Sequence, residues 1–128
     1  MTKFSKNVLI TGAGKGIGEN TVKLFLSKGY FVYALIKDKR DNKKFRNLKN
    51  ISIINGNVKN IKLIKKIILN SNKNNRIITC LVNNAGIRHR KKFLDIKKND
   101  LENVFQTNFF SIFNVMQLFS KNLIKKKL

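Results

Sequence analysis

One stretch decides the fold: Val8-Leu9-Ile10-Thr11-Gly12-Ala13-Gly14-Lys15-Gly16-Ile17-Gly18. It opens with a short continuous apolar run, which is typical of a strand buried on both faces. The glycines that follow allow a tight turn, and they let a pyrophosphate approach the N–H groups at the start of a helix. A plain strand-to-helix turn would also explain glycines, but their place directly after a buried strand favours a nucleotide site.

Strand-like and helix-like segments alternate through the rest of the chain. We predict further strands at 30–36, 51–54 and 77–82, and helices at 17–28, 58–70 and about 100–122, with a short helix and a loop within 37–50. Gly29 is expected to end the first helix in the left-handed conformation. Strands joined by helical crossovers predict an α/β fold, a Rossmann-like doubly wound parallel sheet with strand order 3-2-1-4. A crevice should open at the carboxyl ends of the first and fourth strands.

The helix predicted near 100–122 has the clearest pattern. Asn99 is the expected N-cap, with the carboxylate of Glu102 three residues further on. Asn108 is the one polar side chain inside the apolar stripe, so a buried amide there would need hydrogen-bond partners such as backbone groups. The stripe comprises Leu101, Val104, Phe105, Asn108, Phe109, Ile112, Phe113, Met116 and Phe119.

Length and composition limit the remaining possibilities. The 128 residues fit one domain, 1–128, and 42% hydrophobic residues suffice for a core. No apolar run is long enough to span a bilayer or to form a signal-peptide core. The single cysteine, Cys80, excludes an internal disulfide and suggests a reducing compartment, so we expect a cytoplasmic protein. His89 has no Cys or acidic cluster beside it, so we predict no metal site and a solvated loop.

The net charge of +22 has two explanations. Lysines occur in every predicted helix and in several of the connecting segments, Asn and Ile are frequent, and Pro is absent. This spread favours an A+T-rich genome over a nucleic-acid-binding face. We therefore expect no specific nucleic-acid partner. A basic nucleic-acid-binding protein stays as an alternative, and it predicts binding with a steep salt dependence.

Two motifs resemble one known family. The spacing Thr-Gly-x-x-x-Gly-x-Gly from Thr11 to Gly18, together with Asn83-Asn84-Ala85-Gly86 after the fourth predicted strand, resembles the short-chain dehydrogenase/reductase family over residues 7–128. The chain looks most similar to the β-ketoacyl-acyl-carrier-protein reductase type. The resemblance implies NAD(P)-dependent hydride transfer, a small carbonyl or alcohol substrate, and a homo-oligomer at full length. It implies cofactor contacts at Thr11, Gly12, Gly14, Lys15, Gly16, Ile17, Gly18, Lys37, Asn57, Val58, Asn83, Ala85 and Gly86.

The resemblance also bears on the choice of cofactor. NAD-preferring members end the second strand with an acidic residue, where this chain has Ile36 followed by Lys37. Lys15 is a second cation, and two cations near a dianionic 2′-phosphate favour NADP(H) over NAD(H). Asp38 is the alternative, because a two-residue shift of the loop would let it bind the ribose hydroxyls. Asn57 replaces the usual Asp at the adenine site, and a plain turn-forming Asn is an alternative reading there.

For catalysis the resemblance implies only Asn108, which matches the family's Asn that holds a water in a proton relay. The family's Ser and helical Tyr-x-x-x-Lys have no match: Tyr33 has Lys37 four residues on, but both tyrosines, Tyr30 and Tyr33, lie in the predicted strand 30–36. We therefore expect a cofactor-binding half that ends before a fifth strand and is catalytically incomplete, with an open sheet edge and an apolar helix face. The alternative is a non-catalytic dinucleotide-binding remnant or subunit.

Overall fold

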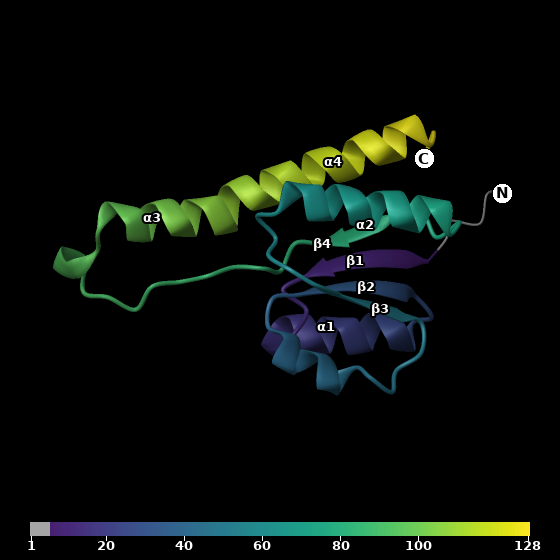
Figure 1. Ribbon diagram of the computed structural model, residues 1–128, viewed down its shortest axis with the longest axis horizontal. Helices are drawn as coiled ribbons and strands as arrows, with labels where there is room; N and C mark the ends of the chain where they lie inside the picture. Colours follow the sequence, from purple (N-terminus) through teal and green to yellow (C-terminus); the bar gives the residue numbers. More distant parts are fainter. Residues whose placement is uncertain (1–5) are drawn as a thin grey trace.

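Four parallel strands form the centre of the molecule. The computed structural model describes residues 6–128, and its strands are β1 (Asn7–Thr11), β2 (Phe31–Ile36), β3 (Ile51–Asn55) and β4 (Cys80–Val82). They pair in the order β3-β2-β1-β4 (Figure 1), which confirms the predicted topology. β4 is shorter than predicted, because its pairing with β1 extends only from Cys80 to Val82.

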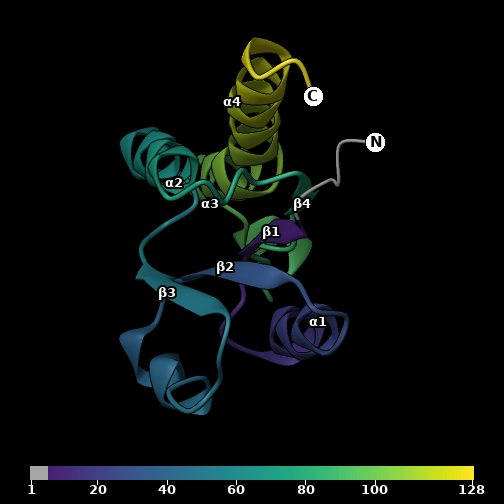
Figure 2. The ribbon, with the colours of Figure 1, turned by 90° about the vertical axis from the view of Figure 1, so that its right-hand side faces the viewer.

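Helices cover both faces of this sheet. α1 (Gly16–Ser27) and the 3-10 helix η1 (Lys39–Lys44) lie on one face, and α2 (Ile61–Lys73) and α4 (Ser111–Lys125) lie on the other (Figure 2). The 3-10 turn η2 (Phe93–Asp95) and α3 (Lys98–Phe105) lie beyond the carboxyl ends of the strands (Figure 1). No helix within residues 6–128 is long and apolar enough to cross a membrane.

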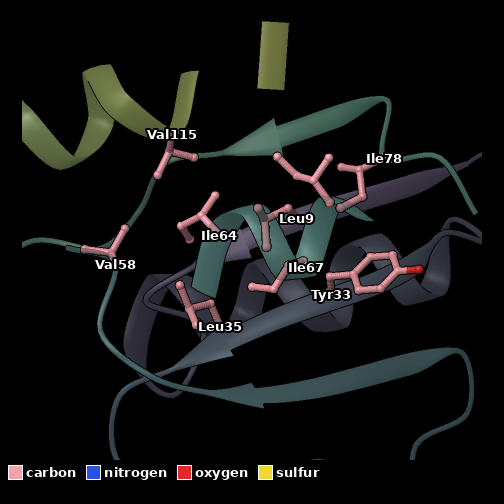
Figure 3. Packing of buried hydrophobic residues seen from close by; sticks show 9 residues of the cluster. Leu9, Tyr33, Leu35, Val58, Ile64, Ile67, Ile78 and Val115 are labelled. Atoms are coloured by element: carbon pink, nitrogen blue, oxygen red, sulfur yellow. The ribbon is translucent and has the colours of Figure 1, made fainter. Parts of the chain in front are cut away.

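Each central strand contributes side chains to two hydrophobic cores, because successive side chains point to opposite faces of a sheet. On β1, Leu9 packs into the core under α2 and α4, where Ile64 and Val115 are fully buried (Figure 3). Val8 and Ile10 pack into the opposite core with residues of α1. Burial on both faces accounts for the continuous apolar run that predicted β1.

A left-handed glycine ends α1, and a side-chain cap begins α2. Gly29 has φ +78°, and the N–H of Tyr30 donates to Phe25 O at 3.0 Å, so the left-handed end expected for α1 is confirmed. α2 begins at Ile61, later than predicted, because the Asn60 side chain caps it by accepting the Leu63 N–H at 3.1 Å.

The start of the long helix was predicted wrongly. The helix begins at Lys98 with Lys97 at the N-cap, so Asn99 is already inside the first turn. The carboxylate of Asp100 caps the helix instead, because its Oδ2 accepts the backbone N–H of Lys97 at 2.9 Å. The same oxygen lies 2.6 Å from Lys91 Nζ, and these contacts lower the pKa of Asp100. The loop that precedes α3 is thereby tied to its first turn.

The long helix is one continuous element with a wide turn in it. The π-helical turn η3 (Gln106–Phe110) joins α3 to α4. Thr107, Ser111 and Val115 are buried against the rest of the protein. Most of the predicted apolar stripe lies on another face and is exposed, namely Leu101, Phe105, Phe109, Phe113 and Met116. The expected uncovered apolar surface is therefore present.

Two substitutions in α2 test this packing. Ile64 is fully buried, whereas Leu69 on the same helix is 58% exposed. We expect Ile64→Ala to lower the free energy of unfolding by about 2–5 kcal/mol, because it leaves a cavity in the core. The matched control Leu69→Ala should cost about 0.5 kcal/mol or less. Urea unfolding measures both, and equal losses would contradict the assigned core.

Candidate functional site

The glycine turn after β1 and the segment after β4 form one hydrogen-bonded unit. Thr11 and Asn84 are 73 residues apart in the chain, yet Thr11 Oγ1 accepts the backbone N–H groups of Asn84 at 3.1 Å and Ala85 at 3.0 Å. The Asn84 side-chain amide donates to Gly12 O at 3.0 Å. Thr11 is 1% exposed, so its hydroxyl joins two strand ends and does not face the solvent.

Two of the glycines are required by packing inside this unit. Gly12 has φ +63°, and a Cβ there would lie 2.7 Å from Ala85 Cα. A Cβ at Gly18 would overlap Gly12 O, so the first turn of α1 packs directly on the glycine turn. Gly16 differs from both: it has φ +56°, and nothing lies within 4 Å of the Cβ position. The open space that the glycine pattern predicts therefore lies at Gly16.

The N-terminus of α1 lies next to this opening and has no side-chain cap. The N-cap residue, Lys15, makes no side-chain capping bond to the helix. The N–H groups of a first turn have no acceptors within their own helix, and the helix dipole adds partial positive charge there. This arrangement suits a phosphate or another anion.

A cleft of about 750 Å³ opens at the carboxyl ends of the strands. Its size is that of a typical small-molecule site. The predicted site residues that line it are Gly12, Gly14, Lys15, Lys37, Asn57, Val58, Ala85 and Gly86. The other predicted residues do not line it: Thr11 and Asn83 lie at the strand ends, and Gly16, Ile17 and Gly18 form the start of α1. The predicted crevice is present, and it collects residues from all four strand ends.

Sequence reasoning missed several lining residues. Asp41 comes from η1, Ile87 from the loop after β4, and Asn103 and Thr107 from the long helix. Lys59 also lines the cleft, and its Nζ donates to Asn103 Oδ1 at 3.1 Å, which ties α3 to the loop after β3. No motif marks these positions. For Thr107 the only available signal was its place next to Asn108.

Asp38, the alternative residue for binding the ribose hydroxyls, is bound by Arg40. Its carboxylate accepts the backbone N–H of Arg40 at 2.9 Å, and Arg40 Nη2 lies 2.6 Å from Oδ2. The hydrogen bonds from Arg40 lower the pKa of Asp38 to about 2. Asp38 also lines the cleft, but its oxygens cap the first turn of η1.

Asn57 and Asn83 differ in how their side chains are satisfied. Asn57 Oδ1 accepts the backbone N–H of Lys59 at 3.0 Å, which is the turn-forming arrangement considered above. Asn83 Oδ1 is buried and has no hydrogen-bond partner among the described residues. A buried oxygen without a donor costs free energy until one is supplied.

Asn108 lies in the π-helical turn η3 and is exposed, so the expected burial of its amide was wrong. Its Nδ2 donates to Ile87 O and its Oδ1 accepts the Ile87 N–H, both at 2.8 Å. A Cβ at Gly86 would lie 3.4 Å from the same Oδ1. Backbone groups thus satisfy the amide, and Asn108 holds the loop after β4 against the helix. π-helical turns occur frequently at functional sites.

The Asp38–Arg40 pair gives a pH prediction. The lowered pKa means that the pair stabilises the fold above the ordinary Asp pKa of 3.8, and that this stability is lost as the pH falls through about 2. An NMR titration of the Asp38 carboxyl carbon should have its midpoint near the lower value. Arg40→Met should move the midpoint toward the ordinary one. The same midpoint in both proteins would contradict the pairing.

Comparisons with known proteins agree with this geometry. The short chain dehydrogenase family matches residues 6–128. The chain is 29% identical over 124 residues to the short-chain dehydrogenase cctT of Talaromyces islandicus, which covers 95% of this chain and 44% of that protein. It is also 29% identical over 129 residues to the 3-oxoacyl-[acyl-carrier-protein] reductase FabG of Buchnera aphidicola subsp. Acyrthosiphon pisum, covering 95% and 51%. The chain spans about half the length of these relatives.

Solved structures give the same result. A structure of ElxO with NADP bound superposes with a TM-score of 0.84 at 30% identity, covering 95% of this chain and 52% of that one. A short chain dehydrogenase from Bacillus anthracis str. 'Ames Ancestor' has a TM-score of 0.87 at 24% identity, covering 94% and 52%, and supports the fold alone. With the family matched over all the described residues, this chain belongs to the short-chain dehydrogenase family.

Proposed function

We propose that this chain is the dinucleotide-binding part of an NAD(P)-dependent oxidoreductase that interconverts a small carbonyl compound and its alcohol. The observation that carries the proposal is the cleft at the carboxyl ends of the strands, which is lined by the N-cap residue of α1, Lys15, and by three further lysines, Lys37, Lys39 and Lys59. When bound, a nicotinamide nucleotide supplies or accepts the hydride. The chain's own residues bind and orient it. We further propose one domain over residues 1–128 and a cytoplasmic location.

The residues present fit a dinucleotide. The open position at Gly16 and the N–H groups of the first turn of α1 would hold the pyrophosphate. Asn57 and Val58, at the end of β3, would contact the adenine end of the nucleotide. Ala85 and Gly86 would contact the nucleotide where it passes the end of β4. The structure assigns Thr11, Gly12 and Gly18 to the packing of the turn that supports these contacts.

We propose NADP(H) over NAD(H). Lys15 and Lys37 both line the cleft, and the Asp38 carboxylate that would favour ribose hydroxyls is bound by Arg40. Two ammonium groups beside a dianionic phosphate attract it, whereas a free carboxylate at the end of β2 would repel it.

Asn108 is the one catalytic residue that we propose for this chain. Its place beside Gly86, at the rim of the cleft, supports a role in holding the reacting region in place.

Tyr33 is 5% exposed in the core and cannot serve as a proton donor in the cleft. We therefore propose that the 128-residue chain binds nucleotide without turnover, which also suits the second candidate, a non-catalytic dinucleotide-binding subunit. The exposed apolar face of α3 and α4 supports association in a full-length protein.

Nucleotide binding is tested by ligand-induced stabilisation. NADPH at 100 times its Kd should raise the free energy of unfolding by about 2.7 kcal/mol, since it binds only the folded chain. Urea unfolding with NADPH, NADH and sodium tripolyphosphate makes the comparison. The polyphosphate controls for nonspecific anion binding by a chain of net charge +22. No stabilisation by either nucleotide, or equal stabilisation by tripolyphosphate, would refute the proposal.

Cofactor preference is tested at Lys37. We expect Lys37→Met to weaken NADPH binding about tenfold and to leave NADH binding nearly unchanged, because one cation beside the extra phosphate is lost. Lys73→Met, in the last turn of α2, removes the same charge away from the cleft and should change neither affinity. Isothermal titration calorimetry measures both constants. An equal loss of affinity for NADPH and NADH would argue against a contact between Lys37 and the 2′-phosphate.

A further inference from the structure

Three of the chain's six acidic residues gather around the glycine turn, where they would oppose an anionic ligand. Asp38 is paired with Arg40, as described above. Asp41 lines the cleft beside Gly14, and a Cβ at that glycine would lie 2.8 Å from Asp41 Oδ2. Glu19 is in the first turn of α1. A carboxylate this close to the proposed phosphate site needs a counter-charge.

Lys44 provides that counter-charge from outside the cleft. Its Nζ lies 3.0 Å from Asp41 Oδ1 and 3.2 Å from Glu19 Oε2. The same ammonium donates to the backbone oxygen of Gly14 at 2.8 Å. One cation thus joins η1, α1 and the glycine turn. The hydrogen bond to Asp41 is the largest cause of a raised pKa of Lys44, so the ammonium stays charged at neutral pH.

The backbone of η1 is fixed, so Asp41 stays at the edge of the cleft. Asn42 and Asn55 exchange two amide hydrogen bonds, at 2.8 and 3.0 Å. Phe45, directly after η1, is fully buried in the core on the α1 side of the sheet. The negative charge therefore stays beside the cleft, where the Lys44 ammonium offsets it.

We propose that Lys44 is a positioning residue for the nucleotide: by neutralising Asp41 and holding the Gly14 peptide, it makes the cleft acceptable to a nucleotide with a 2′-phosphate. This inference rests on the proposed function. The four lysines of the lining, Lys15, Lys37, Lys39 and Lys59, then determine the local charge, because the nearby carboxylates already have partners. If Lys44 is lost, the negative charge of Asp41 acts on the ligand, and it acts most strongly on the ligand with the extra phosphate.

The experiment measures NADPH and NADH affinities of the full 128-residue chain by calorimetry at low and moderate salt. We expect Lys44→Met to weaken NADPH binding about tenfold and NADH binding much less, with a smaller difference at higher salt. Adding Asp41→Asn to Lys44→Met should restore most of the NADPH affinity. Lys44→Arg keeps the charge and should stay near wild type.

Two controls separate this charge effect from damage to the fold. Lys43→Met removes the same unit of charge from the neighbouring exposed residue and should leave both affinities unchanged. Asp41→Asn alone keeps Lys44 and should bind NADPH at least as tightly as wild type, which tests the inference even if Lys44→Met does not fold. Circular dichroism checks each variant.

The possible outcomes are distinct. If the wild type binds neither nucleotide, the proposed function fails and this inference fails with it. If the wild type binds but Lys44→Met weakens both nucleotides equally and Asp41→Asn gives no rescue, Lys44 has only a structural role. Weaker NADPH binding by Asp41→Asn alone would also overturn the inference, because Asp41 would then help the ligand to bind.

Discussion

The structure depends on one close approach, that of the glycine turn to the segment leaving β4. Gly12 has no side chain where Ala85 passes, and the Asn84 amide donates to Gly12 O. Thr11 joins the two backbones through its hydroxyl. A side chain at position 12 would separate β1 from β4 at the mouth of the cleft. The two motifs that carry the family resemblance are therefore two halves of one packed unit.

This unit changes the meaning of the glycine pattern. Glycines before a helix suggest room for a ligand, yet Gly12 and Gly18 are required by contacts within the protein. Of the four glycines from Thr11 to Gly18, only Gly16 has open space at its Cβ position. A sequence pattern shows where side chains must be absent, but not which neighbour fills the space. That neighbour is set by the sheet order, which brings β4 beside β1.

The topology was predictable because burial on both faces of a strand leaves a continuous apolar run, as in β1 and β2. The start of the long helix was not predictable in the same way. Asn99, Asp100 and Glu102 offer competing capping patterns, and Lys91 favours Asp100 from the preceding loop. The residues around the cleft were equally hard to predict from the sequence. Lys44 has no motif, because its partners come from three segments that only the fold brings together.

The distribution of charge connects these points. A chain with 28 basic and 6 acidic residues attracts anions over much of its surface, yet the cleft itself contains Asp38 and Asp41. Each of these carboxylates is bound by a cation that does not line the cleft, Arg40 or Lys44. Because charges that are paired at contact distance nearly cancel at longer range, the unpaired lysines of the lining determine the field that a ligand meets. The pairing, more than the total charge, makes this cleft suited to an anion.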